Sequence, residues 1–418
     1  MARRRVPQQA EFVALELGAP SHLGGVIGRA DGIVHFTAHG LPGEMVRARV
    51  FSAQGGFRRA EVEEILDGRS ADRVPAVCPY FGRCGGCAWL HARYAAQLAL
   101  KSTILRDQLA RIGGFDAPPI RPMIGGARAL GYRNQVRVSV RRDRTLGFAR
   151  AMTHAVMTIE RCHLVVPAIQ ERLAALQGHV HRDAHQVVIR HSERTGQTLV
   201  APALPEAGVE TGQPFLEDEI LGRRFRIGPH AFFQVHTAPA TRALPDGVVP
   251  SGRPTTGDWS QADVLAMLVL DRLDAGPGDV LLDCYSGVGV FAALAAPQVS
   301  RVVGIEYAAS AVADARANCA DLSNVQFLQG KAEEVIREAG GGFDVAIVDP
   351  ARVGCARSVV DALLESRASR LVYVSCDPAT LARDLRLLVD GGFTLRDIQP
   401  LDMFPQTHHI ECVATLRR

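Results

Sequence analysis

The chain has 418 residues, 47% hydrophobic and 22% charged, which fits roughly two or three soluble domains with true cores. No apolar run is long enough to span a bilayer, and no apolar segment follows the basic residues 1–5, so we expect a cytoplasmic protein without a signal peptide or membrane association. The net charge is +3, and the nine cysteines of a cytoplasmic chain indicate metal binding or catalysis rather than disulfides.

The first predicted domain covers residues 10–67 and is built from short β-like runs. Residues 11–17, 32–36 and 44–50 alternate between apolar and polar side chains, and glycine-containing turns separate them. Short strands at regular spacing with turn signals between them are typical of a small barrel.

A cysteine-rich segment follows the predicted barrel. Cys78, Cys84 and Cys87 have the spacing C-x5-C-x2-C, and glycines lie between them. Three close thiols favour a metal centre, and Cys162 is the best candidate for a fourth ligand because polar residues flank it in the same region. The spacing fits both a zinc site and an iron–sulfur cluster.

The segment 121–161 carries nine arginines against Asp143 and Glu160, a net charge of +7. Within it, residues 135–140 alternate cleanly, with valines on one face and Arg137 among the polar residues of the other. This pattern predicts a half-buried strand with a basic outer face, and the clustered charge indicates a phosphate-binding surface.

From about residue 264, predicted helices alternate with apolar strands, which is typical of a doubly wound parallel α/β domain. Three of its strands end in order at Asp283, Glu306 and Asp349. Gly287 and Gly289 follow the first strand and allow a ligand to approach backbone N–H groups. An acid at the end of the second strand suits ribose hydroxyls, so the pattern predicts a nucleotide-containing cofactor.

Cys376 ends the apolar strand 371–376 and is followed by a helix that begins near Pro378. Open α/β sheets place reacting groups at this end of a strand, and a helix N-terminus favours the thiolate. A lone cysteine in this position can also be a buried core residue.

Together these segments resemble the RNA 5-methyluridine methyltransferases, in particular the iron–sulfur branch that acts on uridines of ribosomal RNA. The similarity covers almost the whole chain, and its most specific segments are residues 78–87, 232–236, 349–354, 374–384 and 402–411. It implies a TRAM-type (OB-like) β-barrel at 10–67 and a central α+β RNA-binding domain at 68–227 with a [4Fe–4S] cluster. A class I Rossmann-like methyltransferase domain is implied at 228–418, with the helix near 93–115 packed on it.

The resemblance also implies a set of site residues. The nucleophile is Cys376 and the general base is Glu411. The S-adenosylmethionine contacts are Gln234, Tyr285, Glu306 and Asp349, and the cluster ligands are Cys78, Cys84, Cys87 and Cys162.

The chain departs from the family pattern at three positions. Asp377 follows the nucleophile where Asn is usual, and the negative charge would raise the pKa of the thiol. Val290 and Lys331 stand where Asn contacts the cofactor, so we assign no contact to either.

The implied reaction is attack of a thiolate on C6 of uracil, methylation at C5, and removal of the C5 proton by a carboxylate. The implied partner is ribosomal RNA, with transfer RNA as the alternative, and we expect a monomer. Two other interpretations are an RNA cytosine-5 methyltransferase and a noncatalytic metal-bearing RNA-binding protein. The sequence Asp349-Pro350-Ala351-Arg352 lacks the Pro-Cys pair of the former, and the intact cofactor pattern argues against the latter.

Overall fold

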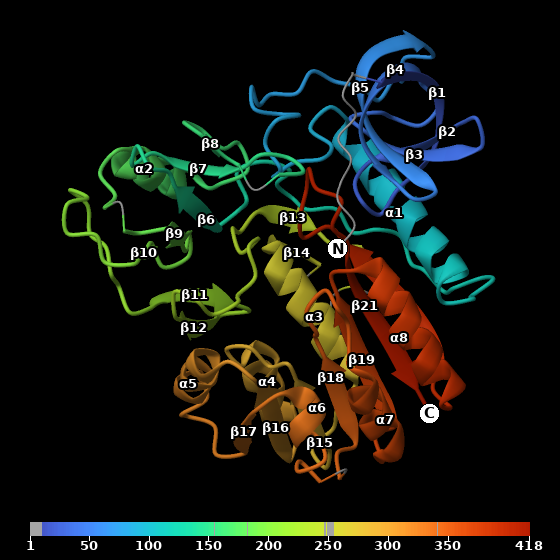
Figure 1. Ribbon diagram of the computed structural model, residues 1–418. Helices are drawn as coiled ribbons and strands as arrows, with labels where there is room; N and C mark the ends of the chain where they lie inside the picture. The colour runs from blue at the N-terminus through green and yellow to red at the C-terminus, as the bar shows by residue number, and fades with distance from the viewer. Residues whose placement is uncertain (1–10, 154, 182, 246–247, 249–254, 341) are drawn as a thin grey trace. The chain divides into compact units, whose positions relative to one another are not determined.

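A computed structural model describes residues 11–153, 155–181, 183–245, 248, 255–340 and 342–418 (Figure 1). The basic residues 1–5 and the first residue of the predicted barrel lie outside these ranges.

The chain divides into two compact units. The first comprises residues up to Asp107 with Phe148–Met157 and Phe404–His409, and the second comprises Gln108–Gly147, Thr158–Met403 and Ile410–Arg418. The three-domain division expected from the sequence stays a prediction.

The first unit contains the predicted barrel. Its strands are β1 (Glu11–Pro20), β2 (Val26–Ala30), β3 (Ile33–Ala38), β4 (Met45–Gln54) and β5 (Phe57–Asp67), and they close in the order β1-β2-β3-β5-β4 (Figure 1). Alternate residues point inward, so Leu15, Leu17, Val46 and Ala48 form its core. The small closed barrel predicted for this segment is confirmed.

The first unit also contains α1 (Tyr94–Arg111), although the last turn of this helix lies beyond the unit's boundary at Asp107. Buried Lys101 donates a hydrogen bond to the carbonyl oxygen of Phe404 (3.1 Å), and the amide of Gln97 donates one to Oε1 of Gln406 (2.8 Å). These bonds fix residues 404–409 within the first unit, although the chain on either side of them belongs to the second. The predicted packing of this helix on the catalytic domain stays a prediction.

The second unit is organised around a seven-stranded sheet with the order β17-β16-β15-β18-β19-β21-β20 (Figure 1). β21 is antiparallel to both of its neighbours, and the other pairs are parallel. All four residues of β18 are buried, which is the continuous apolar pattern of a strand covered on both faces. The predicted α/β domain is confirmed. Its strands are β15 (Val280–Cys284), β16 (Arg301–Glu306), β17 (Val325–Gln329), β18 (Val345–Val348), β19 (Arg370–Ser375), β20 (Thr394–Leu401) and β21 (Glu411–Arg417).

One helix precedes the first strand of this sheet and others connect its strands. They are α3 (Gln261–Leu273), which comes first, and α4 (Val290–Ala295), η1 (Ala296–Gln298), α5 (Ala309–Asn318), α6 (Ala332–Val335), α7 (Arg357–Glu365) and α8 (Pro378–Asp390). None of the helices in the described part of the chain is both long enough and apolar enough to cross a membrane.

A second sheet has the order β10-β9-β6-β7-β8. In β6, Val136 and Val138 are buried while Arg137 is exposed, which confirms the predicted half-buried strand with a basic outer face. The elements of this region are β6 (Gln135–Val140), β7 (Leu146–Ala149), β8 (Val156–Thr158), α2 (Pro167–Leu176), β9 (Gln186–His191) and β10 (Thr198–Ala201). Two hairpins follow, β11 (Leu216–Ile220) with β12 (Arg223–Ile227), and β13 (Thr241–Ala243) with β14 (Thr256–Asp258).

Candidate active site

The carboxyl ends of three neighbouring parallel strands bring predicted cofactor residues to one edge of the sheet. Cys284 of β15 is aligned with Val348 of β18 and with Ile305 of β16. Tyr285, Asp349 and Glu306 are therefore next to one another in register. The backbone N–H of Asp349 donates a hydrogen bond to the carbonyl oxygen of Cys284 (3.2 Å), which continues the pairing beyond the strand ends.

The two predicted catalytic residues meet at the same edge through an antiparallel pair. Ser375, the last residue of β19, is aligned with Cys412 of β21. Cys376 follows Ser375 and Glu411 precedes Cys412, so the register sets the thiol and the carboxyl at neighbouring positions. Glu411 is 3% exposed, and Cys376 is partly buried. Because β21 is antiparallel to β19, the first residue of β21 lies at the edge of the sheet where β19 ends.

The helix after Cys376 uses Asp377 as its N-cap. One oxygen of the Asp377 carboxylate accepts hydrogen bonds from the backbone N–H groups of Ala379 (3.0 Å) and Thr380 (2.9 Å). These are the first amides of α8, which have no partner within the helix. The residue that departs from the family pattern therefore stabilises the start of α8, and its charge is directed at the positive end of the helix.

The charges around Cys376 favour the neutral thiol. Its pKa is raised to about 12, chiefly by burial and then by the charges of Glu411, Asp349 and Asp377, while Arg352 lowers it. Burial also raises the pKa of Asp349 to about 7 and raises that of Glu411 well above its usual range, where the neighbouring charge of Asp349 adds to the effect. Arg352 is the cation that opposes this accumulation of negative charge. No sequence motif had indicated this role for Arg352, although it stands only three residues after Asp349.

A hollow beside the glycine turn has the features of a cofactor site. It is lined by residues of α3, by Phe232, Phe233 and Gln234, by the turn 285–288, and by Asp349. Within the described residues, no hydrogen-bond partner reaches the buried Oε1 of Gln234 or the buried Oγ of Ser286. Buried polar atoms normally have partners, so these two atoms fit a polar ligand that the chain binds.

The backbone of the glycine turn is fixed by Glu306. One carboxylate oxygen accepts a hydrogen bond from the N–H of Gly287 (3.1 Å) and the other from the N–H of Ala308 (2.7 Å). Gly287 has φ +55° and a Cβ there would meet no atom within 4 Å, so the turn leaves open space above its backbone. Asp283 lies beneath the turn, fully buried, and accepts a hydrogen bond from the N–H of Ala292 (2.9 Å). Burial raises the pKa of Asp283 to about 7.

Comparison with known proteins identifies the family. A family model described as tRNA (Uracil-5-)-methyltransferase matches residues 264–418. An uncharacterized RNA methyltransferase of Gloeobacter violaceus is 32% identical over 98% of this chain and 97% of its own length. Another, of Streptomyces avermitilis, is 34% identical over 97% of this chain and 98% of its own length. The chain belongs to the family of these RNA methyltransferases, and its residues 264–418 match the uracil-5 model. It is an S-adenosylmethionine-dependent RNA (uracil-5-)-methyltransferase.

A solved structure supports the fold of this methyltransferase. The Pyrococcus abyssi tRNA (uracil-54, C5)-methyltransferase in complex with S-adenosyl-L-homocysteine aligns over 97% of this chain and 100% of that chain. The TM-score is 0.70 at 22% sequence identity. The similarity shows that the two chains share their overall fold.

The predicted metal ligands of the methyltransferase lie in other segments of the chain than the candidate catalytic and cofactor-binding residues. Cys78, Cys84 and Cys87 belong to the first unit. The loop that carries them contains two turns, in which the N–H of Phe81 donates a hydrogen bond to the carbonyl oxygen of Cys78 (3.1 Å) and the N–H of Cys84 donates one to the carbonyl oxygen of Tyr80 (2.8 Å). Cys162 belongs to the second unit. No cysteine forms a disulfide in the described ranges, but those ranges also contain no group of three or more His, Cys, Asp or Glu side chains arranged to hold a metal ion. The predicted metal site is therefore not confirmed.

Proposed function

We propose that this methyltransferase methylates C5 of a uridine in RNA through a covalent bond between Cys376 and C6 of the base. The observation that carries the proposal is the β19–β21 register, which supplies a thiol and a carboxyl from distant parts of the chain at neighbouring positions. A thiol alone would allow attack on the base, but the reaction also needs a group that removes a proton afterwards.

The chemistry assigns one task to each of these residues. Uracil C5 is a weak nucleophile, and a bond from the Cys376 thiolate to C6 moves electron density onto C5. S-adenosylmethionine, when bound, supplies an electrophilic methyl group, and C5 displaces it from sulfur. Glu411 then takes the C5 proton, the C5–C6 double bond re-forms, and Cys376 leaves as the thiolate.

We propose Gln234, Tyr285, Glu306 and Asp349 as the cofactor contacts. The unpartnered Oε1 of Gln234 and the open glycine turn fit this assignment. Glu306 stands at the end of β16, where an acid suits ribose hydroxyls.

We propose ribosomal RNA as the substrate and transfer RNA as the alternative. The resemblance to the iron–sulfur branch supports ribosomal RNA. The exposed Arg137 on β6 and the neighbouring arginines fit a phosphate-binding surface. The closed barrel of the first unit suits a second RNA-binding surface. The target base must leave its stack to reach Cys376, so single-stranded loops suit the site.

Mapping 5-methyluridine in ribosomal and transfer RNA from a deletion strain tests this proposal. A single uridine should lose its methyl group, and the wild-type gene but not Cys376→Ala should restore it. Methylation of cytidine-only RNA by the purified protein would instead indicate a cytosine-5 enzyme, and loss of the mark from transfer RNA would establish the alternative.

We propose separately that Cys78, Cys84, Cys87 and Cys162 hold a [4Fe–4S] cluster that stabilises the RNA-binding part of the chain. Support comes from the cysteine spacing and the absence of disulfides among the described cysteines. Anaerobically purified protein should be brown and contain iron and sulfide. Colourless protein containing zinc would contradict the cluster. We further propose that the protein is a cytoplasmic monomer with the three domains expected from its sequence.

A further inference from the structure

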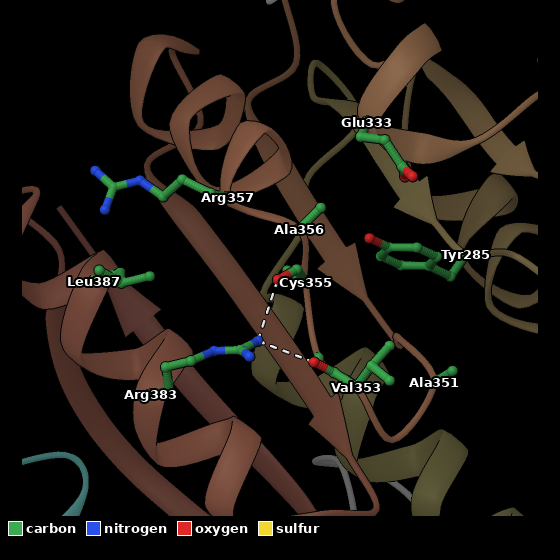
Figure 2. A pocket seen from close by; sticks show the side chains of 10 residues that line it. Tyr285, Glu333, Ala351, Val353, Cys355, Ala356, Arg357, Arg383 and Leu387 are labelled. Atoms are coloured by element: carbon green, nitrogen blue, oxygen red, sulfur yellow. Dashed lines mark hydrogen bonds between the residues drawn. The ribbon is translucent and has the colours of Figure 1, made fainter. Parts of the chain in front are cut away.

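The loop between β18 and α7 is fastened to α8 by two adjacent residues, Arg383 and Asp384, and Figure 2 shows the hydrogen bonds of Arg383. Nη2 of Arg383 donates hydrogen bonds to the carbonyl oxygens of Val353 (3.0 Å) and Cys355 (3.2 Å). Asp384 is fully buried, and its Oδ2 accepts a hydrogen bond from the backbone N–H of Cys355 (2.8 Å). The loop is therefore held through its backbone, independently of its side chains.

The two fastening residues are themselves fixed. Nε of Arg383 donates to Oδ1 of Asp384 (2.7 Å), and the hydroxyl of Tyr373 donates to Oδ2 of Asp384 (2.6 Å). Tyr373 belongs to the fully buried part of β19. The central sheet, α8 and the loop are thus connected through one buried carboxylate, which resists displacement of any of the three.

Gly354 shows how closely the loop approaches α8. A Cβ at this position would lie 2.5 Å from Nη2 of Arg383 and 2.5 Å from Oδ2 of Asp384, and φ is +73°. A side chain could fit only if the fastening residues moved. One turn nearer the start of α8, the hydroxyl of Thr380 donates to the carbonyl oxygen of Arg352 (3.1 Å). α8 therefore contacts the loop at Arg352, Val353 and Cys355.

This arrangement links the position of Arg352 to that of Cys376. α8 begins at Pro378, two residues after Cys376, and the loop it holds carries Arg352, whose positive charge lowers the pKa of the thiol. The loop also walls a cavity of about 570 Å³, in which Arg383 and Tyr285 line opposite parts (Figure 2). Arg352 itself is exposed.

We propose that Arg383 is a positioning residue that holds the 350–355 loop so that Arg352 stays beside Cys376. This inference rests on the proposed role of Cys376 as the nucleophile. Arg383 acts through the loop backbone and touches neither the thiol nor, by this proposal, the base.

The test measures the rate of alkylation of Cys376 by iodoacetamide at pH 8, with each cysteine resolved by peptide mass spectrometry. This pH lies below the pKa of the thiol, so the rate is proportional to the thiolate fraction. In Arg383→Gln the rate should fall about tenfold, the effect of a pKa raised by about one unit when a nearby cation is lost. Arg352→Gln should lower the rate as well. The double variant should be no slower than Arg352→Gln alone, because both changes remove the same interaction.

Two matched variants complete the test. Arg386→Gln removes the same charge from the same helix, but in the described part of the chain the ion pair of Arg386 is with Asp390 and not with the loop, so its alkylation rate should equal that of the wild type. Arg383→Lys keeps a donor and a charge, so its rate should lie between those of Arg383→Gln and the wild type. An unchanged rate in Arg383→Gln, or a double variant whose rate falls by the product of the two single effects, would overturn the proposal.

The alkylation readout needs no RNA and no methyl transfer. If Cys376 is not the nucleophile, Cys376→Ala will retain activity while the alkylation results still report on the loop. Failure of the proposed function and failure of this inference are therefore distinguishable.

Discussion

Ser375 and Cys412 are aligned across the antiparallel strands β19 and β21, and the next residues outward are Cys376 and Glu411. The antiparallel direction of β21 is what makes this possible. A parallel strand in its place would bring its last residue to this edge of the sheet and carry its first residue to the opposite edge. The pairing of nucleophile and base therefore depends on the one strand of the sheet that runs against its neighbours.

Replacing Cys376 with Ala should abolish methylation and leave cofactor binding intact. The thiol is proposed to bond the base, and the cofactor hollow is lined by other residues. We expect a loss of at least about 1,000-fold in kcat, since removal of a covalent nucleophile removes the whole pathway. S-adenosylhomocysteine titration by calorimetry should give a Kd within about twofold of the wild type. Retention of about one per cent of the activity would show that another group attacks C6.

Glu411→Gln should trap the methylated intermediate. Cys376 can still attack and the methyl group can still move, but the thiolate cannot leave until the C5 proton has been removed. A slowly migrating protein–RNA band carrying labelled methyl should appear on a denaturing gel. The band should be absent from the double variant with Cys376→Ala. Near-normal turnover without this band would place the base elsewhere, with His408 or His409 the next candidates.

The rate of methylation should rise with pH through neutrality. The pKa of Cys376 is raised to about 12 by burial, and burial raises that of Glu411 as well, so both groups favour their protonated forms. The reaction needs a thiolate and an unprotonated carboxylate. Because the pKa of the Cys376 thiol lies above this range, each added pH unit should raise kcat/KM by at least about tenfold between about pH 6 and 8, and by nearer a hundredfold where Glu411 is also protonated. Single-turnover assays across this range measure the slope, and a flat profile would contradict the charge state inferred for the site.

Asp283→Asn should stabilise the protein in a pH-dependent manner. The folded-state pKa of Asp283 is about 7, above the ordinary 3.8, so the folded state binds the proton more tightly than the unfolded state. Stability from this group is complete below about pH 4 and falls as the pH rises to about 7. Asn keeps an acceptor for the N–H of Ala292 and does not titrate. Its gain should be near zero at pH 4 and largest above pH 7, with an upper limit of about 4 kcal/mol at roughly 1.4 kcal/mol per pKa unit. Urea unfolding at the two pH values measures this difference, and an equal gain at both would contradict it.

Gln234→Met should affect stability and cofactor affinity in opposite directions. The buried Oε1 of Gln234 has no hydrogen-bond partner among the described residues, and such an acceptor reduces stability by about 1–3 kcal/mol. Met has a similar volume without the acceptor, so the melting temperature of the ligand-free protein should rise. The affinity for S-adenosylhomocysteine should fall by about tenfold or more, because one hydrogen bond is lost. Unchanged affinity would remove Gln234 from the cofactor site.

Much of the fold was predictable because its signals are local. The alternation at residues 11–17 gave a barrel strand, and the apolar run 345–348 gave a strand buried on both faces. Asp283, Glu306 and Asp349 could be expected to lie close together, since parallel strands end at the same edge of a sheet. The capping role of Asp377 was not predictable in this way: its charge was expected to raise the pKa of the thiol, which it does, and the structure shows that it also caps α8.

The sequence by itself determined the strands of the barrel, the alternation of helices and strands from about residue 264, the basic face of β6 and the residue types that the chemistry requires. The tertiary structure decided how residues far apart in the chain act together. The register of β21 against β19 places Glu411 beside Cys376, and Arg383 with Asp384 fastens the loop that carries Arg352. Periodicity and spacing record which side of an element is buried, because burial acts on each residue locally. Strand register and contacts between loops depend on packing across the whole sheet, and no local pattern of residues encodes them.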